Sequence, residues 1–352
     1  MELRDLRNIR EADLYLEPGL NVFVGRNAQG KTSLLEAVGL LARGRSFRTE
    51  QTITLIRRGA SALFARGRTE GEGRRTELEV DLSCVARRLR VDGREVPPRD
   101  YHGRLEVVVY STDRLKVIRG PMRERRAFLD RGASALWPIY RQALRDYERV
   151  VRQRNAALES GARGLEAWDE RFVELGAGLR QRRARYVERL RAALESGAFR
   201  PAGERFDLRV QPAGDPAGEE AHREWLRQEM EARRRDERRL RRTLAGPHRD
   251  AVALLVGGED AAESASSGQA RSLLLALALA ALEVYREERG TAAVALLDDL
   301  DSELDEERAT ELCKQVAVRG QALVTTAHPG WAGRLSRLGR LFEVEQGQVR
   351  AA

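Results

Sequence analysis

The sequence has very little cysteine and no long hydrophobic run. Cys84 and Cys313 stand far apart without a CxxC pair, so neither a disulfide framework nor a zinc site is supported. The first residues, MELRDLRNIR, contain no apolar signal region, and the longest apolar run, residues 273–282, is too short to span a bilayer. We therefore expect a soluble, cytoplasmic protein with no membrane partner.

Lysine is scarce as well. Lys31, Lys116 and Lys314 are three lysines among 63 basic residues, so arginine is the default cation of this chain. A lysine kept at one place therefore indicates a need for a compact charge on a flexible stem, which a planar guanidinium does not supply. The net charge of +8 and the pI near 9.9 favour an acidic partner, most commonly a nucleic-acid backbone. Charge alone is equally consistent with a soluble basic protein that binds no nucleic acid.

The N-terminal third has the pattern of an α/β fold. Short strands come first, and the run LNVFVG enters a glycine-rich loop that is followed by a helical pattern. Residues 52–91 alternate as short strands, and Asp92-Gly93 is a strong hairpin signal, so an antiparallel sheet is expected there. Residues 106–111 (EVVVYS) read as another buried strand.

An Arg-rich helical stretch then interrupts the α/β pattern. Its helices are long enough for a short antiparallel hairpin and too short for an extended coiled-coil arm. The pattern resumes with a helix at 267–288, a strand at 294–299, a helix from Glu306 and a strand at 321–326. The expected domains are the first half of a head at 1–120, a helical insertion at 121–245 and the second half of the head at 246–352.

The strongest motif is a GxxxxGK[ST] loop between a predicted strand and a predicted helix. Backbone N–H groups of such a loop cradle phosphates, Lys31 reaches their oxygens, and the Thr32 hydroxyl can bind Mg²⁺. The motif therefore predicts that the chain binds ATP. The predicted ATP-binding residues of the loop are Gly25, Arg26, Asn27, Ala28, Gln29, Gly30, Lys31, Thr32 and Ser33.

Two acids end the later strand VALLDD. A phosphate-binding loop needs a carboxylate nearby to complete its metal site, and Asp298 is the predicted Mg²⁺ ligand together with Thr32. Asp299, just beyond, is placed to orient or deprotonate the water that attacks the γ-phosphate. Paired acids alone also end many strands, so the interpretation depends on the glycine-rich loop.

A second phosphate-binding device is predicted where Ser266, Gly268 and Gln269 open an apolar helix with free N–H groups and a hydroxyl. Alone, this pattern is also typical of an ordinary helix N-cap. The order along the chain is more specific. It runs from the glycine-rich loop through SxGQ and the strand that ends in acids to SELD at 302–305 and to His328 after a further strand. This series resembles the ABC-type ATPases.

That resemblance implies a shared mechanism. In ABC-type ATPases the signature serine of one subunit contacts the γ-phosphate bound to the other subunit, so ATP joins two heads. By this resemblance Ser266, Gly268 and Gln269 act on the partner's ATP, and residues 302–305 lie at the dimer interface. His328 is the candidate catalytic switch residue that senses the γ-phosphate. The resemblance therefore implies an ATP-dependent homodimer.

Within the ABC-type series, several stretches resemble the RecF family in particular. They are LRNIR, GLNVFVGRNAQGKTSLLEAVGLLARGRSFRT, VVVYSTDRLKVIRGP with RERRAFLDRG, and GPHRD at 246–250. The resemblance implies an α/β fold: an ABC-type P-loop ATPase head, with a mixed α/β sheet, an antiparallel β subdomain and an inserted helical subdomain. Structural-maintenance proteins and zinc-hook repair ATPases resemble the same series but would need long coiled-coil arms, which this sequence is too short to form.

The RecF resemblance also implies a role in recombinational repair, DNA replication and the SOS response to DNA damage. It implies an ATP-bound dimer on double-stranded DNA near single-strand gap junctions, which works with RecR and RecO to load RecA. It further implies a weak, DNA-stimulated ATPase used as a switch, and Asp299 in place of the usual transporter glutamate agrees with slow hydrolysis.

Three positions depart from the family pattern. Ala28 stands where the family usually has glycine, and we expect it to be tolerated with a negative backbone φ. Ser267 lies inside the signature, and Ala251 replaces a second acid after Asp250. None of these departures removes a predicted phosphate ligand.

Arginines of the helical stretch are the candidate DNA contacts, with sequence-tolerant and salt-dependent binding. Two other functions share part of the motif set: the ATPase subunit of a membrane transporter and a small-molecule kinase. The helical insertion disfavours the transporter, and SxGQ and SELD have no use in a kinase. The candidate DNA contacts are Arg123, Arg125, Arg126, Arg182, Arg183 and Arg185.

Overall fold

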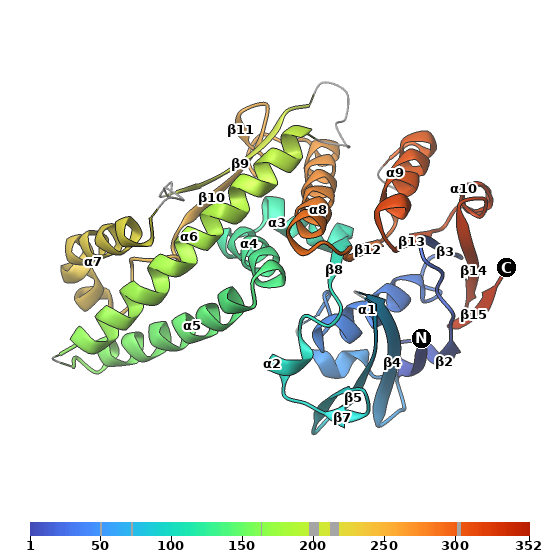
Figure 1. The fold of residues 1–352 in the computed structure, drawn as a ribbon, viewed down its shortest axis with the longest axis horizontal. Helices are drawn as coiled ribbons and strands as arrows, with labels where there is room; N and C mark the ends of the chain where they lie inside the picture. Colours follow the sequence, from blue (N-terminus) through green and yellow to red (C-terminus); the bar gives the residue numbers. More distant parts are fainter. Residues whose placement is uncertain (50, 72, 163, 197–203, 212–217, 301–303) are drawn as a thin grey trace. The chain divides into compact units, whose positions relative to one another are not determined.

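The computed structural model describes residues 1–352 except 50, 72, 163, 197–203, 212–217 and 301–303. The described chain forms two compact units (Figure 1). The head unit comprises Met1–Arg114 and Tyr285–Ala352, and the helical unit comprises Leu115–Val284. The helical unit is therefore an insertion in the sequence of the head unit, as predicted.

A mixed six-stranded sheet forms one half of the head unit. Its order is β15-β14-β3-β13-β12-β8, and every neighbouring pair is parallel except the edge pair β14-β15. Parallel neighbours bring the carboxyl ends of β3, β13 and β12 to one edge. The strands are β3 (Leu20–Val24), β8 (Val107–Tyr110), β12 (Val294–Leu297), β13 (Ala322–Thr326), β14 (Gly339–Glu345) and β15 (Gln348–Ala351).

The predicted antiparallel sheet is confirmed, with the order β2-β1-β4-β5-β6-β7. The hairpin between β6 and β7 turns at Asp92 (φ 50°) and Gly93 (φ 77°), the two positive values that such a turn requires. The strands are β1 (Glu2–Leu6), β2 (Ile9–Asp13), β4 (Ala62–Gly71), β5 (Arg74–Ser83), β6 (Arg87–Val91) and β7 (Arg94–Glu95).

Helix α1 (Lys31–Arg43) contributes to one hydrophobic core together with both sheets. Leu34 and Leu35 are fully buried with Leu3 from the antiparallel sheet and Phe23 from the mixed sheet. The loop before α1 is therefore attached to a rigid support. The other helices of the head unit are η1 (Thr52–Leu55), α2 (Pro98–Tyr101), η2 (Thr112–Leu115), α9 (Glu306–Arg319) and α10 (Pro329–Leu335).

Long helices dominate the helical unit. Helix α6 has 31 residues and packs beside α5 in the predicted antiparallel hairpin (Figure 1). No coiled-coil arm extends from the described residues, in agreement with the sequence. The helices are α3 (Lys116–Arg119), α4 (Met122–Leu136), α5 (Pro138–Glu159), α6 (Glu166–Ser196), α7 (Glu219–Leu240) and α8 (Ser267–Arg289), the last of which continues past Val284 into the residues of the head unit.

A small sheet with the order β11-β10-β9 also belongs to the helical unit. Its strands are β9 (Phe206–Gln211), β10 (Ala251–Val256) and β11 (Glu259–Asp260). Residues 246–284, expected in the second half of the head, therefore lie in the helical unit, because β10 pairs with β9 along its whole length. The predicted boundary between residues 245 and 246 therefore falls inside the helical unit. The predicted division of the head into an N-terminal and a C-terminal half stays a prediction.

Helix α8 is long and apolar enough to cross a membrane by length and composition alone, the one such helix among the described residues. Half of its most apolar window is buried inside the protein, including the fully buried Leu273 and Leu277. A core helix of a soluble protein passes the same test, so this observation is weak evidence for a membrane span.

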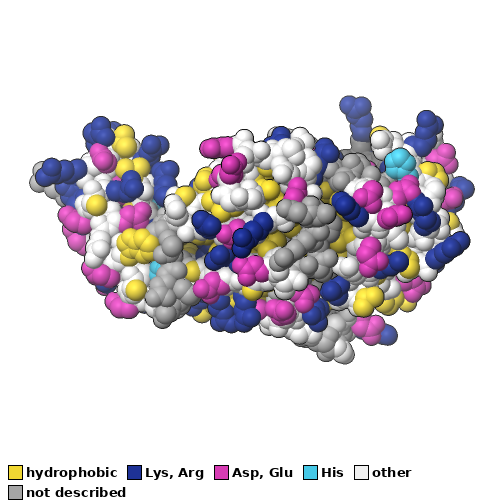
Figure 2. All heavy atoms as spheres, turned by 90° about the horizontal axis from the view of Figure 1, so that it is seen from above, with side chains coloured by type: hydrophobic (Ala, Val, Ile, Leu, Met, Phe, Trp, Pro, Cys, Tyr) yellow, Lys and Arg dark blue, Asp and Glu magenta, His cyan; other side chains and the backbone are white. Residues whose placement is uncertain are grey.

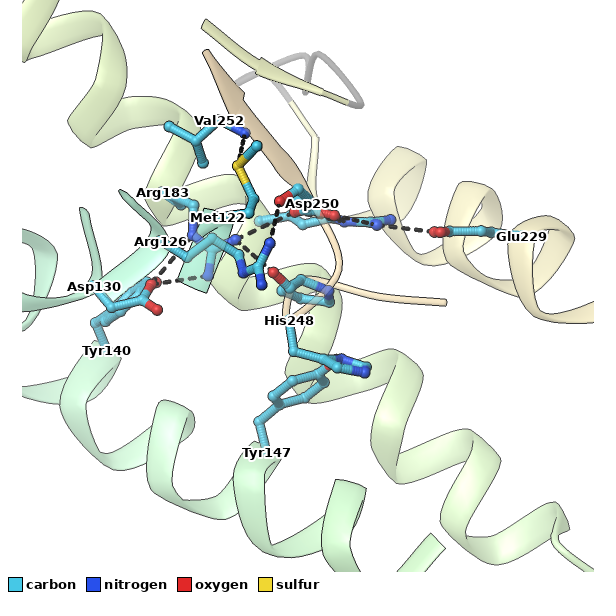
Figure 3. A network of polar contacts seen from close by, with 12 residues as sticks. Met122, Arg126, Asp130, Tyr140, Tyr147, Arg183, Glu229, His248, Asp250 and Val252 are labelled. Carbon is cyan, nitrogen blue, oxygen red and sulfur yellow. Dashed lines mark hydrogen bonds and ion pairs between the residues drawn. The ribbon is translucent and has the colours of Figure 1, made fainter. Parts of the chain in front are cut away.

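Buried ion pairs hold the helical unit together (Figure 3). Arg180 donates to Asp250 at 2.6 Å, and Arg183 donates to Asp130 at 2.9 Å and to Asp250 at 3.3 Å. Burial alone would lower the pKa of Arg183, but the carboxylates of Asp130 and Asp250 hold that pKa above its ordinary value. Both guanidinium groups therefore remain charged inside the unit.

The same burial corrects part of the predicted DNA interface. Arg183 and Arg125 are almost inaccessible, and Arg125 forms a two-pronged pair with Asp260 at 2.8 and 2.9 Å. Arg126 is half-buried and donates to the backbone oxygen of Asp250. Arg125 and Arg183 are thus structural cations that are buried away from the surface, whereas Arg123 and Arg185 are exposed.

The GPHRD segment at 246–250 supplies partners to three helices of this network (Figure 3). Gly246 has φ 107°, and a Cβ there would meet the Tyr147 hydroxyl at 2.5 Å. His248 lies 2.7 Å from that hydroxyl through Nδ1, and burial lowers its pKa to about 4, so it is neutral at pH 7. This motif therefore connects α5 and α6 from inside the unit.

Asp250→Ala should lower the free energy of unfolding by about 3 kcal/mol, because it leaves two buried guanidinium groups with fewer carboxylates. Glu174→Ala, which breaks the exposed pair with Arg171 on the same helix α6, should cost at most about 1 kcal/mol. Urea unfolding followed by tryptophan fluorescence compares the two variants, because three of the four tryptophans lie in the helical unit. Equal losses would show that the buried network is not what holds the unit.

Candidate nucleotide-binding site

The glycine-rich loop joins β3 to α1, as the sequence predicted. Gly25 passes so close to β14 that a Cβ would meet the Val344 carbonyl oxygen at 2.1 Å, so only glycine fits. Gly30 precedes α1 with φ 116°, a conformation that glycine adopts readily. The first N–H groups of α1 lack intrahelical acceptors and can bind an anion at this end.

Lys31 is the first residue of α1, and its side chain is buried by the loop. Its ammonium donates to the backbone oxygens of Gly25 at 2.6 Å and Arg26 at 3.0 Å. The side chain is thus held across the loop, where it can donate to a phosphate oxygen. This geometry needs a compact ammonium, which agrees with a rare lysine at this position.

Ala28 corrects one expectation from the sequence. Its φ is +65°, in the left-handed region, whereas a negative value was expected. An L-residue in this conformation costs about 1–2 kcal/mol relative to the right-handed region. The loop therefore imposes the geometry that glycine would adopt freely, and this alanine accepts the strain.

Two segments that sequence reasoning did not assign to the site hold the loop from outside. The Asn8 amide donates to the Gln29 backbone oxygen at 2.9 Å. The turn between β14 and β15 binds Gln29 as well, through the N–H groups of Gln346 at 2.6 Å and Gly347 at 2.9 Å. Asn8 lies in the LRNIR stretch, which was the only sequence signal for this contact. Ser33, a predicted ligand, donates its hydroxyl to Asn8 at 3.5 Å.

Asp298 meets the loop at the carboxyl edge of the mixed sheet. Its Oδ1 accepts hydrogen bonds from the Thr32 hydroxyl at 2.9 Å and the Thr325 hydroxyl at 2.7 Å. Strand β12 is not adjacent to β3, because β13 lies between them and supplies Thr325. Burial raises the pKa of Asp298, although both hydroxyl donors lower it.

This arrangement fits a magnesium ion. The Thr32 hydroxyl and the Asp298 carboxylate are oxygen donors side by side, and a cation would offset the burial of that carboxylate. No group of three or more His, Cys, Asp or Glu side chains suited to a metal occurs among the described residues. Magnesium is commonly held by one carboxylate with water and phosphate oxygens, so such a group is not needed here.

Asp299 and His328 lie at the same sheet edge. The Asp299 N–H donates to the Thr325 hydroxyl at 2.9 Å, and its φ of 56° is uncommon for a residue other than glycine. His328 follows β13, is exposed, and precedes α10, while its N–H donates to the Thr326 hydroxyl at 2.9 Å. The predicted catalytic residues and the glycine-rich loop therefore share one edge of the head unit.

The SxGQ segment lies in the helical unit and forms a reciprocal cap of α8. The Ser266 hydroxyl accepts from the Gln269 N–H at 3.1 Å, and the Gln269 side chain accepts from the Ser266 N–H at 2.9 Å. The ordinary-cap interpretation is therefore correct as local structure. It still permits phosphate binding, because an accepting hydroxyl keeps its own proton to donate. Arg119, which the sequence did not single out, supports the segment through the Ala265 oxygen at 3.2 Å.

The SELD segment at 302–305 is only partly described. Residues 302 and 303 lie outside the described residues, so the predicted dimer contact there is not addressed by the structure. Asp305 is the N-cap of α9, and its carboxylate accepts from the Arg308 N–H at 2.9 Å.

Comparisons with known proteins give one consistent result. The family model described as the RecF/RecN/SMC N terminal domain matches residues 1–350. The DNA replication and repair protein RecF of Symbiobacterium thermophilum is 40% identical over 339 residues, which cover 92% of this chain and 90% of that protein. A RecF–ATP structure, described as a recombination mediator protein in the RecFOR pathway, has a TM-score of 0.90 at 27% identity and covers 100% and 98% of the two chains.

A more distant structure shows the fold class. The Smc head domain from Pyrococcus furiosus, solved with the C-terminal domain of ScpA, has a TM-score of 0.60 at 15% identity, over 100% of this chain and 94% of that chain. Together with the family model and the RecF–ATP structure, this likeness confirms the predicted fold class, an ABC-type ATPase head with a mixed sheet, an antiparallel sheet and a helical insertion.

Asp298→Asn should stabilise the protein without nucleotide at pH 7 by about 1 kcal/mol or more, because it removes a buried charge and keeps an oxygen for both hydroxyl donors. Burial raises the folded-state pKa of Asp298, so its ionisation destabilises the fold only above the unfolded value of about 3.9. Thermal unfolding of both proteins from acid to neutral pH should show a difference that grows as pH rises. A variant less stable than wild type at pH 7 would contradict this account.

Proposed function

The chain belongs to the RecF family of DNA replication and repair proteins, and from this premise we propose that it is an ATP-gated DNA-binding switch. The observation that carries the proposal is the 2.9 Å contact between Thr32 and Asp298, which joins the glycine-rich loop to the paired acids. A switch of this kind binds ATP, forms a dimer, and dissociates after the ATP is hydrolysed. The transporter and kinase alternatives have no support among the relatives found.

ATP binding rests on three groups of the head unit. The loop from Gly25 to Gly30 encloses the phosphates with backbone N–H groups, and Lys31 donates to their oxygens. Thr32 and Asp298 would hold Mg²⁺, directly or through water. The bound ion would neutralise charge on the β- and γ-phosphates, which lowers the cost of placing them beside a carboxylate.

Hydrolysis needs a group that positions or deprotonates water near the γ-phosphate. Asp299 is the candidate because it follows the metal ligand and shares the same sheet edge. His328 at the end of β13 is the candidate γ-phosphate sensor. An aspartate is one methylene shorter than a glutamate, which agrees with slow hydrolysis that sets how long the ATP-bound state lasts.

Dimerisation rests on the segment from Ser266 to Gln269. The Ser266 hydroxyl proton and the first N–H groups of α8, Gly268 and Gln269 among them, are donors for a γ-phosphate bound by a second copy of the chain. Each ATP would then be bound by the loop of one protomer and the signature of its partner. Residues 302–305 are proposed to lie at that interface.

The dimer is proposed to bind double-stranded DNA and single-strand gap junctions in the cytoplasm. DNA binding would stimulate a weak ATPase, and the protein would act with RecR and RecO to load RecA. Support comes from the relatives' names, the RecFOR pathway of the related structure and the net charge of +8. Recognition of a backbone by arginines should tolerate any sequence and weaken with salt.

Ser266→Arg should leave ATP binding intact and abolish ATP-dependent dimers, because a long cation would occupy the place of the partner's phosphate. Light scattering should show the mass of wild type double with ATP and Mg²⁺, and the mass of the variant stay constant. Ser336→Arg, an exposed change in the head unit, is the control for added charge. A variant that still dimerises with ATP would refute the role of the signature.

Asp299→Asn should slow ATP hydrolysis by about 100-fold or more, because an amide cannot accept a proton from water. Asparagine also adopts the left-handed conformation of this position, so the backbone should not change. Phosphate release under saturating ATP measures the rate, and retained ATP-dependent dimers confirm that binding is intact. Turnover at the wild-type rate would place the catalytic carboxylate elsewhere.

A further inference from the structure

Many arginines of this chain form ion pairs with acidic side chains or are buried. On the side of the antiparallel sheet turned away from the core, Arg66 binds Glu79 at 2.9 Å, and Arg90 binds Glu79 at 3.2 Å. Four further arginines of the helical unit are buried in it. On the face drawn in Figure 2, basic and acidic side chains are interspersed over most of the surface. The net charge therefore does not locate a DNA interface, and unpaired arginines must be found individually.

The C-terminal end of α7 differs from these regions. Residues 231–242 carry seven arginines and three acids, and every residue among them is exposed except Glu237. Two arginines are paired, Arg234 with Glu231 and Arg239 with Asp236, each at 2.8 Å. Five have no ion pair within the described part of the chain. These five, the basic end of α7, are Arg233, Arg235, Arg238, Arg241 and Arg242.

The basic end is fixed in position by one buried carboxylate. Glu237 accepts from Arg154 of α5 at 2.7 Å and from the Leu244 N–H at 2.7 Å. Arg154 in turn binds Asp169 of α6 at 2.8 Å. The helix end is therefore tied to α5 and α6 by charge, and its arginines need no apolar contact to stay in place.

From this arrangement we infer that the basic end of α7 binds the phosphate backbone of double-stranded DNA, an inference that rests on the proposed function. Arg235 and Arg238 stand three residues apart on the helix, so they share one side of α7, whereas the buried Glu237 faces α5. Arg242 lies just beyond the helix, after Arg241, whose φ of 53° ends α7. Guanidinium groups this close in the sequence can each donate two hydrogen bonds to a phosphate.

The composition of this end favours a duplex over other anionic surfaces. Single-stranded nucleic acid is held mainly by stacking on aromatic side chains, and residues 231–242 contain none. A membrane-binding helix needs an apolar face, and this end offers only Leu240 and one alanine. A helix C-terminus attracts cations, but that effect is confined to the last turn and does not account for arginines from 233 onward.

The uneven distribution of charge along α7 also favours DNA binding at this end. Its first half carries Glu219, Glu220 and Glu224, which pair with Arg223 and Arg227, so it offers phosphates no net attraction. Positive charge is therefore concentrated at one end of one helix. DNA is therefore expected to contact α7 at this end and not along its first half.

The test replaces Arg235, Arg238 and Arg242 with glutamine in one variant and measures affinity for a labelled mixed-sequence duplex with ATP over a salt series. Each phosphate contact contributes about 0.9 to the slope of log affinity against log salt. The slope of the variant should therefore be shallower by about 3, and its affinity at low salt should fall by about 100-fold. ATP-dependent mass doubling should be unchanged.

The matched control replaces Arg171, Arg223 and Arg227 with glutamine, which removes the same charge from arginines that have acidic partners. This control should keep the wild-type slope. Wild-type affinity and slope in the α7 variant would overturn the inference while the proposed function stands. Equal losses in both variants would overturn it too, because net charge would then explain binding. If wild type binds no duplex with ATP, the proposed function itself fails.

Discussion

The carboxylate of Asp298 is the point on which the nucleotide site depends. Its two hydroxyl donors come from the start of α1 and from β13, so one buried charge joins segments 266 and 27 residues away in the sequence. The parallel order of β3, β13 and β12 makes this possible, because it ends all three strands at one edge. Burial makes this charge unfavourable without a cation, so the proposed binding of a metal ion with phosphates would be favoured at this position.

Arginine serves two opposite purposes in the helical unit. Arg154 and Arg180 are buried with carboxylates, where they fix how α5, α6 and α7 pack and are unavailable to a ligand. A buried pair of this kind specifies geometry more than it adds stability, because desolvation offsets most of its attraction. The exposed arginines at the end of α7 depend on that geometry, since Glu237 and Arg154 hold the helix end in place.

The sequence predicted the parts of the fold that depend on local pattern. The glycine-rich loop, the turn at Asp92-Gly93 and the strand that ends at Asp298 all carry signals within a few residues. It did not predict what depends on tertiary contact: Asn8 against the loop, β13 between β3 and β12, or the pairing of β10 with β9. For the same reason the sequence does not distinguish the buried Arg183 and Arg125 from exposed arginines, because their carboxylate partners are distant in sequence.

The two predicted phosphate-binding devices lie in different units of the chain, and α8 joins them. This helix begins at the Ser266 cap in the helical unit and ends at Arg289 in the head unit. Its N-terminal cap is complete without a ligand, so Ser266 and Gln269 need no phosphate to hold their conformation. A signature formed in advance loses little conformational entropy when a partner's ATP arrives. In the proposed dimer, the free energy of that contact would then hold the two protomers together.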